Sequence, residues 1–141
     1  MLIYLDSVVL IYSVEGEPAR KKQVTILLAD LLISGNRLAI SDLCLLECYI
    51  RPIRDNNQIL ISEFDRSLSA PLFLKLPISS EVFQRATYYR ASHRLELADA
   101  LHLATAVLGG CEKFLTNDKH LCGKSIPEIV IELLPEIPTI P

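Results

Sequence analysis

Four acidic residues stand where folding could bring their carboxylates together. Asp6 and Asp118 each follow a short apolar run, and Asp99 lies near the start of a segment rich in Ala and Leu. Glu47 has apolar neighbours and follows a further apolar run. Carboxylates that share a site repel one another, and a divalent cation relieves that repulsion. Such a cluster would hold Mg²⁺ or Mn²⁺, which prefer oxygen ligands, and would suit hydrolysis of phosphodiester bonds.

The segment around Asp99, residues 97–108, is predicted to be a buried helix. Its Ala and Leu residues favour a helix, and apolar residues lie on all sides of it. Asp99, His102 and Thr105 follow at intervals of three and form one polar stripe on this helix. We expect this stripe to face the acidic site, with His102 as a packed, hydrogen-bonded histidine rather than a metal ligand.

Short apolar runs alternate with helical segments along the whole chain. This alternation is typical of an α/β fold in which helices cover both faces of a parallel sheet. The expected strands are residues 2–5, 38–40, 72–76, 113–116 and 129–133. The expected helices are residues 8–14, 18–34, 42–51, 54–68, 81–93 and 97–108, with a turn or short helix at 119–122. In such folds the site lies beyond the carboxyl ends of the strands, where Asp6 and Asp118 stand.

Breaking residues set several expected boundaries. Pro52 is expected to end the helix that begins at Asp42, and Gly109 with Gly110 to end the helix around Asp99. The proline-rich tail from about residue 135 is expected to be extended. The chain of 141 residues is long enough for one compact domain, residues 1–141, with a sizeable core.

Composition narrows the class of protein. No charge-free run is long enough to span a bilayer, and the first residues lack a basic signal-peptide region, so we expect a cytoplasmic protein with no membrane partner. The net charge of −3 argues against a broad basic surface, although bound cations would still attract phosphate. Cys44 and Cys48 lie four apart and could help bind zinc, but buried thiols are the favoured interpretation.

Each acidic residue also has an ordinary structural explanation. Asp6 and Asp118 could cap the helices that follow them, and Asp99 could be favoured by the helix dipole in a first turn. Glu47 could reach solvent at the edge of its helix. The joint occurrence of all four favours a shared site, because capping residues need not converge.

These motifs resemble the PIN-domain family, and more closely the VapC-type toxins of bacterial and archaeal toxin–antitoxin pairs. The likeness rests on Tyr-Leu-Asp-Ser at 4–7, Glu47, Ala-Asp-Ala-Leu-His-Leu-Ala-Thr-Ala at 98–106 and Phe-Leu-Thr-Asn-Asp at 114–118. The motifs stand in the family's order over nearly the whole chain. The resemblance implies a three-layer α/β/α sandwich around a mostly parallel sheet of four to five strands.

The resemblance also implies an activity: an endoribonuclease that depends on Mg²⁺ or Mn²⁺ and cleaves an RNA substrate. It implies metal-binding and catalytic roles for Asp6, Glu47, Asp99 and Asp118, and site-lining roles for Thr116, Asn117 and Ser7. Its members are commonly homodimers held inactive by a cognate antitoxin protein, so we expect these partners as well.

One departure from the family pattern concerns phosphate binding. The family often has a basic residue and a proline shortly before the central Asp, whereas neither stands in that place before Asp99. Arg94 or Lys119 could supply the missing contact.

Two other functions stay open: a PIN-like binding module that acts through RNA or an antitoxin without turnover, and a different phosphoryl-transfer domain with Asp6 as nucleophile.

Overall fold

Helices alternate with strands throughout residues 1–137, the part of the chain that the computed structural model describes. The strands are β1 (Leu2–Leu5), β2 (Arg37–Ser41), β3 (Phe73–Leu76), β4 (Lys113–Thr116) and β5 (Val130–Leu133). The helices are α1 (Ser7–Glu15), α2 (Pro18–Ile33), α3 (Asp42–Arg54), α4 (Gln58–Leu68), α5 (Ser80–His93), α6 (Leu97–Leu108) and α7 (Lys119–Cys122).

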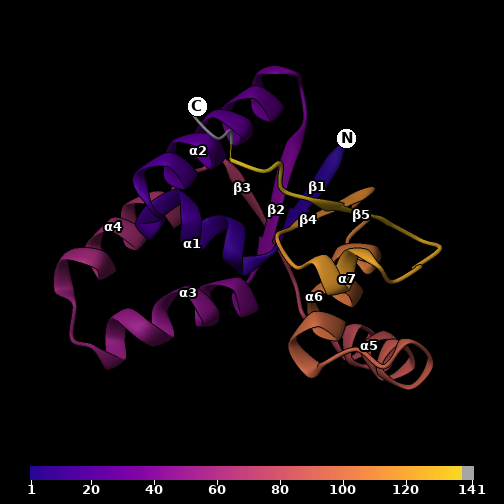
Figure 1. The fold of residues 1–141 in the computed structure, drawn as a ribbon. Coiled ribbons are helices and arrows are strands. Elements are labelled where there is room, and N and C mark those ends of the chain that lie inside the picture. Colours follow the sequence, from indigo (N-terminus) through magenta and orange to yellow (C-terminus); the bar gives the residue numbers. More distant parts are fainter. Residues whose placement is uncertain (138–141) are drawn as a thin grey trace.

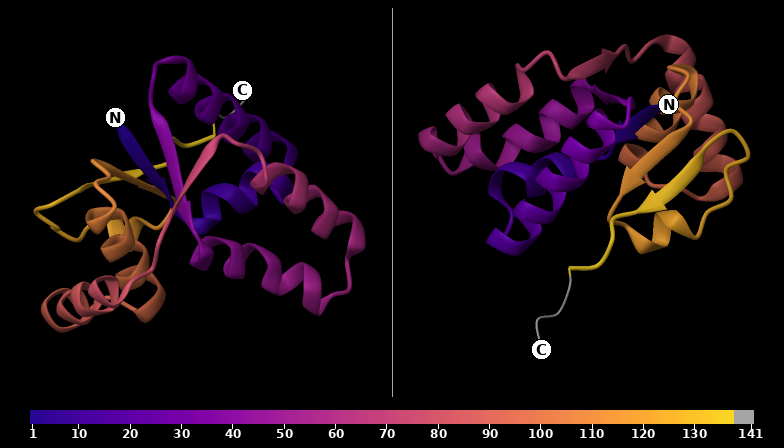
Figure 2. Two further views of the ribbon diagram at one scale, coloured as in Figure 1. Left: turned by 180° about the vertical axis from the view of Figure 1, so that it is seen from behind. Right: turned by 90° about the horizontal axis from the view of Figure 1, so that it is seen from above.

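The strands form one five-stranded sheet in the order β3-β2-β1-β4-β5, and every pair is parallel. Parallel crossovers are right-handed, so the face on which a helix lies follows from the direction of its connection. The connections from β1 to β3 run one way along the sheet and those from β3 to β5 run back. Helices α1–α4 accordingly lie on one side of the sheet and α5–α7 on the other (Figures 1 and 2). The predicted α/β/α architecture is confirmed.

The strand order changes direction between β1 and β4. At this point the backbone N–H of Asp6, just after β1, donates to the carbonyl of Leu115 at 2.9 Å. Asn117 and Asp118 follow β4 directly. The ends of two neighbouring strands therefore deliver polar residues to one place, as the topology of open α/β sheets favours.

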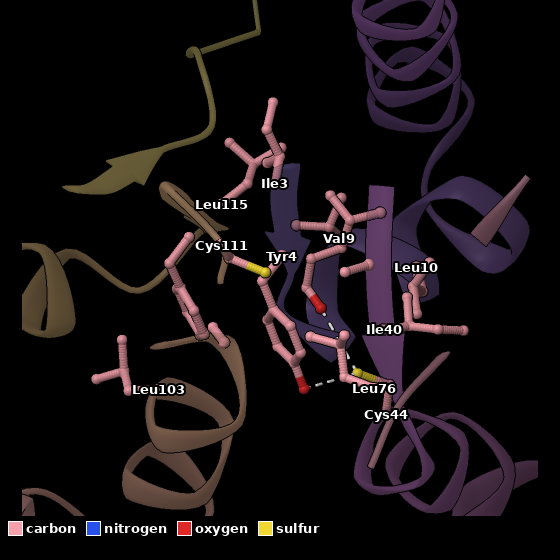
Figure 3. Close-up of a cluster of buried hydrophobic side chains, with 14 of the residues drawn as sticks. Ile3, Tyr4, Val9, Leu10, Ile40, Cys44, Leu76, Leu103, Cys111 and Leu115 are labelled. Atoms are coloured by element: carbon pink, nitrogen blue, oxygen red, sulfur yellow. Dashed lines mark hydrogen bonds between the residues drawn. The ribbon is translucent and has the colours of Figure 1, made fainter. Parts of the chain in front are cut away.

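Aromatic and aliphatic side chains from the central strands fill the core (Figure 3). Tyr4 of β1 and Phe114 of β4 are fully buried and stack with their ring centroids 5.3 Å apart. Helix α6 lies against the sheet with Ala100 and residues 102–106 buried. A helix that is apolar on most sides is stable only in such a position.

Pro52 does not end α3, contrary to the sequence-based prediction. The helix continues to Arg54, with Pro52 buried inside it. Backbone N–H groups of Asp55 and Asn57 donate to Arg51 and Pro52 at 2.9 Å each, and these bonds with the packing of Pro52 offset its missing donor. The next helix, α4, then begins at Gln58 rather than residue 54, because the side chain of Asn57 caps it.

The other boundaries agree with the sequence within one or two residues. Helix α6 has the expected bounds and ends at Gly109, followed by Gly110 with φ of 82°. Beyond β5, the carbonyl of Pro135 accepts hydrogen bonds from Arg20 and Gln23 of α2. The remainder of the predicted extended tail, 138–141, lies outside the described residues. Within residues 1–137, no helix has both the length and the apolar character that a bilayer crossing requires.

Candidate active site

A cleft of about 590 Å³ opens at the carboxyl ends of β1 and β4. Its polar lining includes Asp6, Ser7, Glu47, Asp99, Asn117 and Asp118. Apolar side chains of α1 and α3, including Leu46 and Ile50, complete the wall. The structure thus brings all four acidic residues singled out in the sequence to one cleft, from segments far apart in the chain.

Asp6 lies at the junction of β1 and α1 and is held at both carboxylate oxygens. Its Oδ1 accepts from the backbone N–H of Ser7 at 2.8 Å, and its Oδ2 accepts from Oγ1 of Thr116 at 2.7 Å. Burial raises the pKa of Asp6, as does the charge of Glu47, against the opposing effects of His102 and of its hydrogen bonds. Asp6 therefore caps a helix and lines the cleft at the same time.

The end of β4 provides three neighbouring polar residues. Thr116 is fully buried, and besides its bond to Asp6 it accepts from the backbone N–H of Asp118 at 3.1 Å. Asp118 caps α7 by accepting from backbone N–H groups of that helix, and its side chain still lines the cleft. Asn117 donates to the hydroxyl of Tyr12 at 3.1 Å. The capping interpretation of Asp118 is correct and does not exclude a role in the site.

Asp99 projects into the cleft from the first turn of α6. Burial raises its pKa to about 6, with further contributions from the charges of Asp6 and Asp118. Carboxylates that oppose one another's ionisation in a cleft are a donor set that fits a hard divalent cation. The residues present therefore suit Mg²⁺ or Mn²⁺.

Glu47 reaches the same cleft from α3, where it is half-buried. Its Oε1 accepts from Oγ of Ser7 at 2.7 Å and from Nε2 of His102 at 2.5 Å. Burial opposes ionisation of Glu47, but these two bonds outweigh it and lower its pKa below the usual value. Glu47 is therefore ionised at neutral pH and fixed in place, rather than free at the helix edge.

His102 lies beneath the carboxylates and is 1% exposed. Its Nε2 is 3.8 Å from Oδ1 of Asp6, and ligand atoms of Asp6, Glu47 and His102 all lie within 4.8 Å of one another. Burial lowers the pKa of His102, but hydrogen bonds to Cys44 and Glu47 and the charge of Asp6 raise it overall. The expectation of a packed, hydrogen-bonded histidine is confirmed.

Thr105, the third residue of the predicted polar stripe, does not face the cleft. Thr105 is buried and donates to the carbonyl of Leu101 in its own helix, so it does not line the cleft. Sequence reasoning included Tyr4 in the motif at 4–7 but assigned it no role, whereas its hydroxyl lies 2.7 Å from Nδ1 of His102. The available signal was a tyrosine in an otherwise aliphatic strand, two residues before Asp6. Cys44 and Cys48 are buried thiols on α3, as favoured over zinc ligands.

The two basic residues proposed for phosphate binding do not line the cleft. Arg94 is exposed and ends α5 with φ of 54°. Lys119 is exposed at the start of α7, next to Asp118. Among the described residues that line the cleft, none is Lys or Arg. Any phosphate bound there would meet carboxylates, so its attraction must come from a cation held by them.

Comparison with protein families and solved structures adds a relationship to this geometry. The PIN domain family profile matches residues 3–125. A search of curated proteins gives no match. A VapBC2 structure from Rickettsia felis, bound to a DNA fragment from its promoter, shares 17% identity at a TM-score of 0.74, over 96% of this chain and 100% of that one.

Two further structures are similar. A toxin–antitoxin complex from Klebsiella pneumoniae shares 25% identity at a TM-score of 0.64, over 91% of this chain and 95% of the other. VapC20 of Mycobacterium tuberculosis, a toxin that cleaves the sarcin–ricin loop, shares 14% identity at a TM-score of 0.67, over 91% and 98%. These matches show that the chain shares its fold with solved structures of toxin–antitoxin proteins. The chain belongs to the PIN domain family, a family of nucleases.

Proposed function

We propose that this protein is an endoribonuclease that depends on Mg²⁺ or Mn²⁺, and the toxin of a type II toxin–antitoxin pair. The observation that carries the proposal is the convergence of Asp6, Glu47, Asp99 and Asp118 on one cleft at the reversal of strand order. Burial raises the pKa of Asp99, and the charges of Asp6 and Asp118 raise it further, as expected of carboxylates gathered to bind a cation.

In this proposal Asp6, Asp99 and Asp118 hold the cation, and Glu47 contributes a carboxylate from α3. When bound, a divalent cation activates water and neutralises charge on a phosphodiester during in-line attack. Thr116 orients Asp6 through its hydrogen bond at 2.7 Å. Ser7 and Asn117 line the cleft beside them. Arg94 and Lys119 are left as contacts for more distant phosphates of the RNA.

The partners and location follow from the family and stay proposals. Complexes with antitoxins among the structural neighbours support a cognate antitoxin for this chain. We further propose a cytoplasmic homodimer in which residues 1–141 form a single PIN domain. The second candidate function is a binding module without turnover, which the absence of Lys and Arg from the described lining of the cleft favours.

RNA cleavage by the purified chain, freed of any bound partner, tests the proposal. Wild type and Asp6→Asn are compared on tRNA, rRNA and mRNA in Mn²⁺, Mg²⁺ and EDTA. Cleavage that needs metal and disappears in Asp6→Asn is expected. Well-folded, partner-free protein that binds RNA but cleaves none of these substrates would support the binding module instead.

A further inference from the structure

A column of buried polar side chains stands behind Glu47. The hydroxyl of Tyr4 lies 2.7 Å from Oγ of Ser41 and 2.7 Å from Nδ1 of His102. The opposite ring nitrogen, Nε2, donates to Oε1 of Glu47 at 2.5 Å. The column thus runs from the end of β2, through β1 and α6, to the wall of the cleft.

These polar groups are expensive to bury, and packing alone does not require them. Tyr4 and Ser41 are fully buried and His102 is 1% exposed. Burial of a hydroxyl or imidazole is unfavourable unless each polar atom is hydrogen-bonded, and apolar side chains of similar volume would fill the same space. Here the polar atoms satisfy one another, and the column meets the cleft at Glu47.

The geometry also fixes which ring atom faces Glu47. Because Nδ1 is engaged by Tyr4, a flip of the His102 ring would place carbon atoms at both hydrogen-bonded positions. The bonds from His102 and Ser7 both reach Oε1 of Glu47, and neither uses Oε2. The second carboxylate oxygen therefore stays available to a cation in the cleft.

We infer that His102 is a positioning residue, which holds Oε1 of Glu47 through Nε2 and is itself held by Tyr4, so that Oε2 is preset for the divalent cation. This inference rests on the proposed function. It assigns His102 an action through Glu47 and not direct coordination, although its Nε2 lies among the possible ligand atoms. Partners that orient ligands in this way commonly change metal affinity 10- to 100-fold when removed.

Two substitutions separate the two ring nitrogens. The amide nitrogen of Gln reaches the place of Nε2, whereas that of Asn reaches only the place of Nδ1. We expect His102→Asn to weaken Mn²⁺ binding about tenfold and to lower kcat of RNA cleavage, and His102→Gln to restore most of both. Mn²⁺ affinity is measured by electron paramagnetic resonance, without RNA, and His93→Asn on α5 serves as the control.

A second variant guards against loss of folding. Tyr4→Phe keeps the ring that stacks on Phe114 and removes only the hydroxyl that holds His102. We expect its thermal unfolding to stay cooperative and its Mn²⁺ affinity to fall about threefold, less than for His102→Asn, because the bond from Nε2 of His102 to Glu47 remains.

A double-mutant cycle with Glu47→Gln distinguishes positioning from direct coordination. If His102 acts through Glu47, then His102→Asn weakens Mn²⁺ binding little further once Glu47→Gln is present. Additive losses would overturn the inference in favour of direct coordination. Unchanged Mn²⁺ affinity in folded His102→Asn would overturn it while leaving the nuclease proposal intact. Absence of Mn²⁺ binding and of cleavage in wild type would instead remove both.

Discussion

Thr116 donates a hydrogen bond to Asp6 at 2.7 Å, although the two residues are 110 positions apart in the chain. The bond joins the ends of the two central strands and fixes a carboxylate at the rim of the cleft. Because Thr116 is fully buried, its hydroxyl has been placed there at the cost of desolvation. A buried donor aimed at an acidic residue is a feature that mutation can test directly.

Thr116→Val should lower kcat of RNA cleavage about tenfold, because Asp6 loses the donor that orients Oδ2. A hydrogen bond to a charged group is worth about 1.5–3 kcal/mol, so the free energy of unfolding should fall by a similar amount. Thr105→Val is the matched control, since its hydroxyl bonds only within α6. Equal kcat in Thr116→Val and wild type would contradict the role assigned to Thr116.

Asp99→Asn should abolish cleavage and yet stabilise the metal-free protein. The pKa of Asp99 is raised to about 6, so between pH 4 and 6 the unfolded chain loses its proton first and stability falls as pH rises. Above pH 6 the free energy of unfolding of Asp99→Asn should exceed that of wild type by about 1 kcal/mol, after allowance for the partial exposure of this residue. Urea unfolding at pH 4 and 7 measures the difference.

The control for Asp99→Asn is Glu96→Gln, which removes one negative charge from the exposed residue just before the same helix. It should retain cleavage, and because Asp99 is still present its stability should fall between pH 4 and 6 nearly as it does in wild type. An Asp99→Asn protein that cleaves RNA at the wild-type rate would remove Asp99 from the site. An Asp99→Asn protein less stable than wild type at pH 7 would show that the carboxylate is not repelled.

Mg²⁺ and Mn²⁺ should raise the melting temperature of wild type, because the assembled carboxylates bind the cation only in the folded state. A ligand at one hundred times its Kd stabilises a protein by about 2.7 kcal/mol. The shift should be much smaller in Asp6→Asn and should be reversed by EDTA. Sodium chloride at matched ionic strength controls for general screening, and an equal shift with that salt would contradict a specific site.

Gly16→Ala should destabilise the protein by about 1–3 kcal/mol, because a Cβ at this position would lie 2.6 Å from the carbonyl oxygen of Tyr12. The neighbouring backbone belongs to α1, whose Tyr12 holds Asn117 at the cleft. Gly123→Ala is the control, since its closest contact would be 3.4 Å. Equal unfolding free energies for the two variants would show that the end of α1 yields easily.

Much of this fold could be predicted because local signals agree with the tertiary structure. Helix α6 has the predicted bounds, since its composition favours a buried helix and Gly109 ends it. The failure at Pro52 has a tertiary cause: the proline is buried in α3, and packing overrides the local preference to stop. Local rules hold where the surrounding contacts reinforce them.

The candidate site divides in the same way. Asp6, Asp99 and Asp118 could be proposed because each stands at the end of a strand or the start of a helix. The contacts of Glu47 could not be predicted. Its partner His102 lies 55 positions later in the chain, and His102 is oriented by Tyr4, which lies 98 positions before it. Such contacts depend on how α3, α6 and β1 pack together, which the pattern of residues along the chain does not show.

Because β1 and β4 are neighbours in the sheet but far apart in the chain, the two halves of the cleft are synthesised at different times. Asp118 is added to the growing chain 112 residues after Asp6. At about 5–20 residues per second, roughly 6–22 seconds separate the two during synthesis. A chain that stops before Asp118 therefore carries acidic residues but no assembled cleft, because the cleft is complete only once Asp118 has been added.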